Sequence, residues 1–230
     1  MAHGEPLHLR PTAPLGERVL LPGDPGRALA LAQLLLVEPR MFNHHRGLWG
    51  YTGEASDGEL LTIQATGMGG PSAAIVLSEL IALGATRAIR VGTCGALADD
   101  LVLGEIVIAR DSISADGTSR AIGGGERASA DPALTDALSR RLPTARTGTV
   151  VSVDLFYEAG APGAGHDALA VEMEAATLFA LGAAAGVPVA CVLAVSDTFD
   201  ADGGRTRIDD DTLLATSERM AAAAVDAFAA

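Results

Sequence analysis

The sequence predicts one α/β domain with helices packed on both faces of a β-sheet. Short apolar runs alternate with helix-like stretches along the chain, which is the pattern of layered α/β proteins. Several of the short runs are apolar at nearly every position, as expected for strands that are covered on both sides. Neither an internal repeat nor a long linker divides the chain, so we expect a single domain over residues 1–230.

The individual elements follow from these runs. Strands are predicted at residues 19–21, 60–65, 88–91, 105–109, 147–151 and 189–195. Helices are predicted at residues 26–36, 72–83, 132–142, 174–185 and 210–228. The last helix has one stripe at helical spacing that predicts a face packed on the core, made of Leu213, Ser217, Met220, Ala224 and Phe228. Residues 116–129, rich in Gly, Ser, Arg and Asp, are expected to form an exposed loop, and residues 160–165 a flexible stretch.

The composition describes a globular, acidic protein. The 230 residues are 49% hydrophobic and carry a formal net charge of −13. This charge disfavours nucleic acid or an anionic membrane as the main partner. No apolar run reaches the ~20 residues that span a bilayer, and residues 1–10 lack the pattern of a secretory signal. Cys94 and Cys191 lie in apolar or glycine-rich runs, so we expect two buried, unreactive thiols and a reducing, cytoplasmic setting.

Residues 20–27, with the sequence LLPGDPGR, join a strand to a helix and are typical of an anion site. Gly23 has no Cβ, so its backbone N–H can approach an anion closely. Asp24 suits the N-cap and Pro25 suits the first turn of the helix. A helix N-terminus with Arg27 in its first turn attracts phosphate. An ordinary capped turn is the alternative interpretation.

Arg90, an arginine inside an apolar strand, is the second candidate for phosphate binding. A buried charge is costly unless it is paired. Its partner is either a bound phosphate, to which Thr93 adds a hydroxyl, or an internal acid such as Asp24. The chain contains no lysine, so its anion sites must use arginine, whose planar fork suits phosphate.

Acidic residues are the candidates for sugar binding and proton transfer. Glu172 and Glu174 lie at the start of a predicted helix, where carboxylates can accept hydrogen bonds from vicinal hydroxyls or, alternatively, cap the helix. Asp197 follows a predicted strand, and ligands bind at such carboxyl ends. An Asp in a partly apolar pocket retains a proton more readily and can donate it to a leaving group. Arg205 or Arg207, in the predicted loop that follows, could control that proton.

Other motifs carry less specific signals. The glycine turn at residues 65–72 resembles a dinucleotide fingerprint, but the next strand offers no acid for a ribose, so we predict no nicotinamide site. His44 and His45 would point to opposite faces of a strand, so we predict no metal site. Phe156 and Tyr157 form an aromatic pair that can stack on a nucleobase or fill a hydrophobic corner.

Taken together, these motifs resemble the nucleoside phosphorylase family that contains the hexameric bacterial purine nucleoside phosphorylases and the uridine phosphorylases. The matching stretches occur in the same order and are LLPGDPGRA, NHHRGLWGYTG, TGMGGPSAAI, RVGTCGA, DLFY, VEMEAATLF and VSD. The resemblance implies an α/β/α sandwich around a mixed, partly closed sheet. It also implies active sites shared across a dimer interface, usually within a homohexamer. The expected substrates are a nucleoside and inorganic phosphate, and no cofactor, nucleic acid or membrane is expected to take part.

The resemblance also implies a role for each matching residue. The expected phosphate-binding residues are Gly23, Arg27, Arg90, Thr93 and Arg46, the last of which would reach a neighbouring subunit's phosphate. The expected nucleoside-binding residues are His8, Met68, Cys94, Gly95, Phe156, Tyr157, Glu172, Met173, Glu174 and Ser196. Of these, His8 would cross the interface toward the 5′-hydroxyl of the sugar. Asp197 is expected to act on the purine ring, with Arg205, Arg207 or neither assisting it.

The same resemblance favours purines over uridine. Similar uridine phosphorylases carry a Gln-x-Arg pair in a longer insertion after the aromatic segment, whereas residues 158–165 are short and contain no Gln. Ser196-Asp197 is the pair found in purine members, and Asp197 predicts tolerance of 6-aminopurines as well as 6-oxopurines. We therefore predict a purine nucleoside phosphorylase. A uridine phosphorylase, a hydrolytic nucleosidase of the same superfamily and a non-catalytic nucleoside-binding protein are the alternatives.

Overall fold

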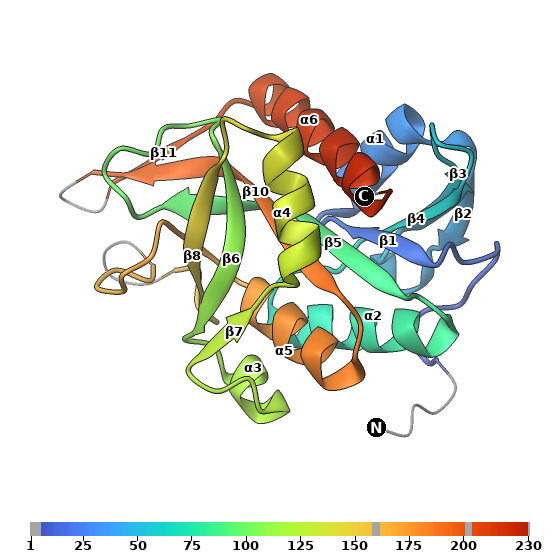
Figure 1. Ribbon diagram of the computed structural model, residues 1–230, viewed down its shortest axis with the longest axis horizontal. Helices are drawn as coiled ribbons and strands as arrows, with labels where there is room; N and C mark the ends of the chain where they lie inside the picture. The colour runs from blue at the N-terminus through green and yellow to red at the C-terminus, as the bar shows by residue number, and fades with distance from the viewer. Residues whose placement is uncertain (1–5, 158–161, 201–203, 230) are drawn as a thin grey trace.

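The computed structural model describes residues 6–157, 162–200 and 204–229, which fold into helices on both faces of a sheet (Figure 1). The strands are β1 (Arg18–Leu21), β2 (Val37–Asn43), β3 (Gly50–Glu54), β4 (Leu60–Gln64), β5 (Arg87–Ala96), β6 (Ile106–Ser114), β7 (Arg127–Ser129), β8 (Arg146–Ser152), β9 (Ala170–Glu172), β10 (Val189–Phe199) and β11 (Arg205–Arg207). The helices are α1 (Pro25–Leu35), α2 (Gly70–Leu83), α3 (Gly117–Ile122), α4 (Pro132–Arg141), α5 (Ala175–Ala185) and α6 (Asp210–Phe228), with one 3-10 turn, η1 (His45–Gly47).

The sheet is mixed and closes on itself over part of its width. Its strands run in the order β11-β10-β6-β8-β9-β5-β1-β4-β3-β2. The long strand β5 pairs in parallel with β1 and β10, and near its end it pairs antiparallel with β9. Because β10 leads through β6, β8 and β9 back to β5, these strands form a closed ring, while β1 to β4 extend it as an open sheet. The predicted mixed, partly closed sheet is confirmed.

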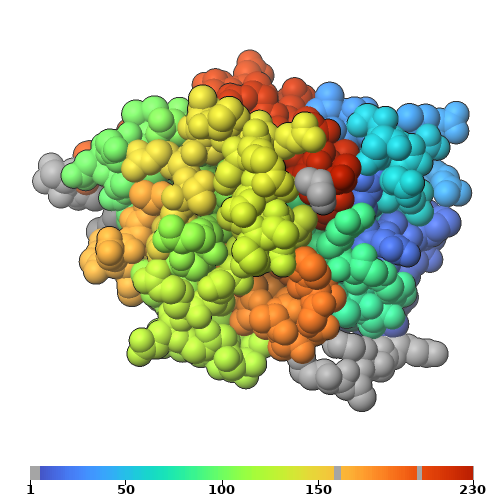
Figure 2. All heavy atoms as spheres, in the orientation of Figure 1, coloured from blue at the N-terminus to red at the C-terminus, as the bar shows by residue number. Residues whose placement is uncertain are grey.

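Side chains that alternate along the central strands pack into two hydrophobic cores, one on each face of the sheet. In β10, Ala190 and Val192 face the core formed with α1, α4 and α6, whereas Cys191 and Leu193 face the core formed with α2 and α5. In the space-filling view, the side chains of α4 (yellow) lie against those of α6 (red) over one face of the sheet (Figure 2). This three-layer arrangement explains why the strands are apolar on both sides. None of the described helices is long and apolar enough to cross a membrane.

The predicted strands and helices are confirmed, with two differences in extent that matter for the site. Strand β5 continues to Ala96 and β10 continues to Phe199. Asp197 therefore lies within a strand and not after it. Both cysteines are free and buried, and burial raises the pKa of each thiol well above its ordinary value, so they stay neutral, as expected.

The exposed loop predicted at residues 116–129 is wrong. This segment contains helix α3 and strand β7. Asp116 is fully buried and accepts hydrogen bonds from the Ser119 N–H (2.8 Å), which caps α3, and from the Thr177 hydroxyl of α5 (2.9 Å). Arg120, Glu126 and Arg127 are exposed, as predicted, whereas the buried Asp116 anchors the short helix to α5.

Other short elements were also not predicted. Strands β2, β3 and β9 were missed, and the segment around Arg205 and Arg207, predicted as a loop, forms strand β11 against the end of β10. His45 belongs to the turn η1 and not to a strand. The flexible stretch predicted at residues 160–165 lies partly outside the described residues.

A buried arginine at the start of β1 leads to a prediction about stability. Arg18 is 3% exposed and donates from both terminal nitrogens to the carboxylate of Asp57, which lowers the pKa of Asp57 to about 2. We expect Asp57→Asn to lower the free energy of unfolding by about 1–3 kcal/mol at neutral pH. The depressed pKa means that this stabilisation is complete above the ordinary Asp pKa and is lost as the pH falls through about 2.

Urea unfolding of the two proteins at several pH values measures this effect. The difference between them should shrink steadily below pH 4. Asp136→Asn, which removes an exposed carboxylate on α4, is the control and should change nothing. A difference that is constant with pH would show that the carboxylate charge of Asp57 does not stabilise the fold.

Candidate active site

A cavity of about 340 Å³ lies where the ends of β1, β5 and β10 meet the start of α5. The predicted site residues that line it are Gly23, Arg27, Met68, Arg90, Thr93, Cys94, Gly95, Phe156, Glu172, Met173, Glu174, Ser196, Asp197 and Arg205. The lining residues to which the sequence assigned no ligand contact are Asp24, Pro25, Gly67, Gly92, Val153, Leu155, Pro162, Val171 and Phe199. Residues as far apart in the chain as Gly23 and Arg205 therefore meet at one cavity, as the motifs predicted.

One end of the cavity is formed by the turn between β1 and α1. Asp24 is the N-cap of α1 and its Oδ1 accepts the Arg27 N–H at 2.7 Å, and Pro25 is the first helical residue. The Arg27 guanidinium makes no hydrogen bond or ion pair with any residue that the structure describes. Burial and the nearby charge of Arg90 lower the pKa of Arg27. An anion bound between Arg27 and Arg90 would offset both the burial of Arg27 and the repulsion between the two guanidiniums.

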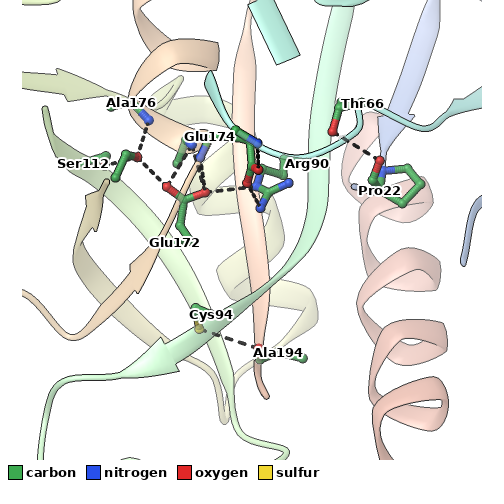
Figure 3. Close-up of polar contacts among 12 residues, drawn as sticks. Pro22, Thr66, Arg90, Cys94, Ser112, Glu172, Glu174, Ala176 and Ala194 are labelled. Carbon is green, nitrogen blue, oxygen red and sulfur yellow. Dashed lines mark hydrogen bonds and ion pairs between the residues drawn. The ribbon is translucent and has the colours of Figure 1, made fainter. Parts of the chain in front are cut away.

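Arg90 is almost completely buried and is held by two glutamates (Figure 3). Its Nε donates to Glu172 Oε2 at 3.2 Å and its Nη2 donates to Glu174 Oε2. These acids are its internal partners, and Asp24, the partner considered from the sequence, is not. Burial opposes the charge of Arg90, but the two carboxylates outweigh it and raise its pKa.

The third nitrogen of Arg90 is left without a partner. Nη1 is buried and makes no hydrogen bond with the described part of the chain. It lies on the side of Gly23, where a Cβ would come within 3.9 Å of it. Gly92 makes this conformation possible, because a Cβ at that position would lie 2.7 Å from the Arg90 Cζ. The guanidinium thus combines two satisfied donors with one that is available to a ligand.

The two glutamates have different surroundings. Glu172 accepts hydrogen bonds from the Ser152 hydroxyl and from the backbone N–H groups of Glu174 and Ala175, both at 2.9 Å (Figure 3). It therefore caps α5, which was the alternative interpretation of this acid, and burial raises its pKa. Glu174 accepts from Arg90 and from the Gly69 N–H at 2.5 Å. Glu174 has fewer internal partners, so it is the better placed of the two to accept a ligand hydroxyl.

Asp197 lies at the other side of the cavity, on β10. The register of β10 against β5 shifts between Val195 and Asp197, and such irregularities re-aim side chains near functional sites. Asp197 Oδ2 accepts the Ser196 hydroxyl at 2.7 Å. Its Oδ1 is buried without a hydrogen bond from a described residue, and the nearest cations are Arg207 Nε at 3.4 Å and Arg205 Nη1 at 4.0 Å.

Aromatic rings form the wall beside Asp197. The Arg205 Cζ lies 4.0 Å from the ring centroid of Phe156 and 5.3 Å from that of Phe199. Phe199 also packs on Gly95, where a Cβ would lie 2.8 Å from its ring. A signal for Phe199 was present in the local pattern, because residues two apart on a strand share a face and Asp197 is a predicted site residue.

Four predicted site residues lie outside this cavity wall: His8, Arg46, Tyr157 and Arg207. Tyr157 is 92% exposed, and its ring meets the Phe156 ring edge-on with the centroids 5.0 Å apart. His8 Nδ1 lies 2.7 Å from Glu79 Oε1, and Arg46 is exposed in the turn η1. Their expected roles at a subunit interface stay predictions. Over the described residues, no group of three His, Cys, Asp or Glu side chains could hold a metal ion.

Comparisons with known proteins agree with this architecture. The profile of the phosphorylase superfamily matches residues 17–230. A protein of Alkaliphilus metalliredigens named purine nucleoside phosphorylase DeoD-type is 36% identical over 85% of this chain and 88% of its own length. The protein of the same name from Caldanaerobacter subterraneus is 38% identical over 80% of this chain and 84% of its own.

A solved structure shows the same fold. Uridine phosphorylase from Vibrio fischeri ES114, determined alone and with 6-hydroxy-1-naphthoic acid, superposes with a TM-score of 0.80. It is 26% identical and the match covers 94% of this chain and 92% of that chain. The family predicted from the motifs is confirmed, and the chain belongs to the phosphorylase superfamily.

Proposed function

We propose that this protein is a purine nucleoside phosphorylase that cleaves purine ribo- and deoxyribonucleosides reversibly, giving the free base and the pentose 1-phosphate in nucleoside salvage. One arrangement carries the proposal: Arg27 and the free Nη1 of Arg90 lie together at one end of a cavity that has Asp197 at its other side. The curated relatives named purine nucleoside phosphorylase, at 36–38% identity over most of the chain, support the same function.

Inorganic phosphate is the proposed co-substrate at the arginine end. Two neighbouring guanidiniums favour a dianion: among the described residues Arg27 has no partner, and Arg90 has one donor without a partner. The backbone at Gly23 and the hydroxyl of Thr93 add neutral donors beside them. No further cofactor is proposed, because the reaction needs positive charge for phosphate and a proton for the base, and arginines and a carboxyl group supply these.

Asp197 is the proposed proton donor. Bond breaking leaves positive charge on the sugar and negative charge on the departing purine. The phosphate dianion stabilises the sugar and then bonds to its C1′ carbon, while Asp197 transfers a proton to N7 so that the base leaves neutral. Arg207 is proposed to assist by pairing with the carboxylate that remains.

Two alternative functions of the same site are a uridine phosphorylase and a hydrolytic nucleosidase. Uridine phosphorylase is the alternative favoured by the Vibrio fischeri structure, which has the same fold. A hydrolytic nucleosidase would have no use for the free donors of Arg27 and Arg90. The absence of Gln from residues 158–165, four of which lie outside the described part, favours purines over uridine.

We propose that the active sites are shared across a dimer interface within a homohexamer and that the protein works in the cytoplasm. His8 and Arg46 support the sharing, because both lie outside their own cavity and near one another, with His45 Nδ1 3.0 Å from the carbonyl oxygen of His8. Exposed Leu7 and Trp49 add apolar surface to the same region. The two free, buried cysteines fit a reducing compartment.

A substrate panel tests the proposed function. Inosine, adenosine, guanosine and uridine are incubated with and without phosphate, and free base and pentose 1-phosphate are quantified. We expect purine release that depends on phosphate, with one pentose 1-phosphate formed per base. Full-rate cleavage in phosphate-free buffer would identify a nucleosidase, a preference for uridine would identify a uridine phosphorylase, and tight binding without any cleavage would identify a non-catalytic binding protein.

Arg27 offers a separate prediction for the phosphate end. Because its guanidinium has no partner among the described residues, Arg27→Ala should leave the unfolding free energy unchanged within about 0.5 kcal/mol. Loss of a charge-assisted hydrogen bond should raise the KM for phosphate about 10- to 100-fold. Steady-state kinetics against phosphate measures the change, and Arg40→Ala, an exposed arginine on β2, is the control. An unaltered KM for phosphate would remove Arg27 from the site.

A further inference from the structure

Arg205 occupies a fixed position in the cavity wall that its role as a possible helper of Asp197 does not explain. Its side chain is 23% exposed and its guanidinium carbon lies 4.0 Å from the Phe156 ring centroid and 5.3 Å from that of Phe199. Its Nη2 donates to the carbonyl oxygen of Phe156 at 3.5 Å. Two rings and a carbonyl thus hold the guanidinium, while Nη1 lies 4.0 Å from Asp197 Oδ1.

Arg207 differs from Arg205 although both lie on the same face of β11. Arg207 is directly opposite Asp197 in the strand pairing and its Nε lies 3.4 Å from Oδ1, but its side chain is 65% exposed and does not line the cavity. Arg207 is therefore the closer ion-pair partner of Asp197. Arg205 is more buried and lines the cavity; its Nη1 lies 4.0 Å from Asp197 Oδ1 but makes no hydrogen bond with a described residue, so it can donate one to a ligand beside Asp197.

The edge of a purine that contains N7 differs between the two main classes of substrate. A 6-oxopurine presents two acceptors there, N7 and O6, whereas a 6-aminopurine presents the acceptor N7 and an amino donor. A guanidinium can only donate hydrogen bonds. In the proposed reaction Asp197 donates a proton to N7, so Asp197 and Arg205 act as two neighbouring donors, which match N7 and O6 and oppose the 6-amino group.

We infer that Arg205 makes the site selective for 6-oxopurine nucleosides over 6-aminopurine nucleosides, by donating a hydrogen bond to O6 while Asp197 serves N7. This inference rests on the proposed function and deepens it. Asp197 alone accommodates both classes, as expected from the sequence, and Arg205 adds the discrimination. Its anchoring by Phe156 and Phe199 matters, because a donor held in place discriminates better than one that can turn away to water.

The ratio of kcat/KM for inosine to kcat/KM for adenosine, at saturating phosphate, tests this role. We expect the unmodified protein to prefer inosine, and Arg205→Met, which keeps the contact with the rings but removes the donors, to lower the ratio about 10-fold or more. Arg207→Met should slow both substrates by the same factor, because it acts through Asp197. Thr206→Ala, an exposed change on the same strand, is the control for the hairpin itself. An unmodified protein without a preference for inosine, or an unchanged ratio in Arg205→Met, would overturn the inference.

A binding measurement separates this inference from the proposed function. Calorimetric titration with hypoxanthine and with adenine requires no turnover. The unmodified protein should bind hypoxanthine more tightly, and Arg205→Met should lose this difference while its circular dichroism spectrum stays the same. One outcome is that no nucleoside is cleaved, while hypoxanthine still binds more tightly than adenine and this difference in affinity is lost in Arg205→Met. In that case only the proposed function fails. If both bases bind equally well to the unmodified protein, the inference fails whatever the turnover.

Discussion

Replacing Asp197 by Asn should lower the kcat for inosine phosphorolysis by about 10²- to 10⁴-fold, the usual cost of losing a general acid. The carboxyl group lies in the cavity with one oxygen bound to the Ser196 hydroxyl and the other free of hydrogen bonds from the described residues. Asn keeps the size of the side chain but cannot transfer a proton to N7 in the same way. The KM for phosphate should stay within about 2-fold, because the proposed phosphate ligands are Arg27 and Arg90, and Arg90 pairs with Cys191, well before Asp197 on β10.

A nucleoside that needs no proton provides the matched control. 7-Methylinosine already carries the positive charge that protonation of N7 would create, so its cleavage should be much less sensitive to Asp197→Asn. Steady-state rates on the two nucleosides, measured with the same preparations, give the comparison. Equal losses on both would show that Asp197 has a structural role, and undiminished turnover of inosine would remove it from the mechanism.

Replacing Arg90 by Met should destabilise the protein by about 3–5 kcal/mol and abolish phosphorolysis. Arg90 is the cation that balances Glu172 and Glu174, both of which are about 5% exposed. Without it, two carboxylates remain buried at the start of α5 with only neutral donors. The loss of stability is expected to be larger than for Arg27→Ala, because the Arg27 guanidinium makes no ion pair with a carboxylate of the described residues.

Unfolding in guanidinium chloride at two pH values tests this role of Arg90. Burial already raises the pKa of Glu172, and removal of the cation takes away the charge that opposes this rise, so buried carboxylates are left without a counter-charge. Their unfavourable contribution therefore grows as the pH rises above about 4.3, and the deficit of Arg90→Met should be smaller at pH 4 than at pH 7. Arg90→Lys keeps the charge without the planar fork, so its free energy of unfolding should lie between those of the unmodified protein and Arg90→Met. A variant Arg90→Met as stable as the original would show that the glutamates do not need this counter-charge.

Local patterns were enough to predict most of the fold. Helix α6 was predicted with its observed bounds because its mostly apolar stripe, from Leu213 to Phe228, repeats at helical spacing over about four turns. The central strands were recognisable because both of their faces are buried. Strands β9 and β11 were not, since each has three residues and owes its extended form to a neighbouring strand. Residues 116–129 were misjudged because burial of Asp116 depends on Thr177, which is 61 residues away.

The sequence alone was enough to predict the family, the types of side chain in the site and the end of the sheet at which these side chains lie. It was enough because capped turns, glycines and buried charges leave local signatures. The folded chain was needed to learn that Arg90 is balanced by Glu172 and Glu174 and that Arg205 lines the cavity while Arg207 pairs with Asp197. Spacing assigns a side chain to a strand and a face. Its partner, here 82 or 84 residues further along the chain, depends on strand register and packing, which no local pattern contains.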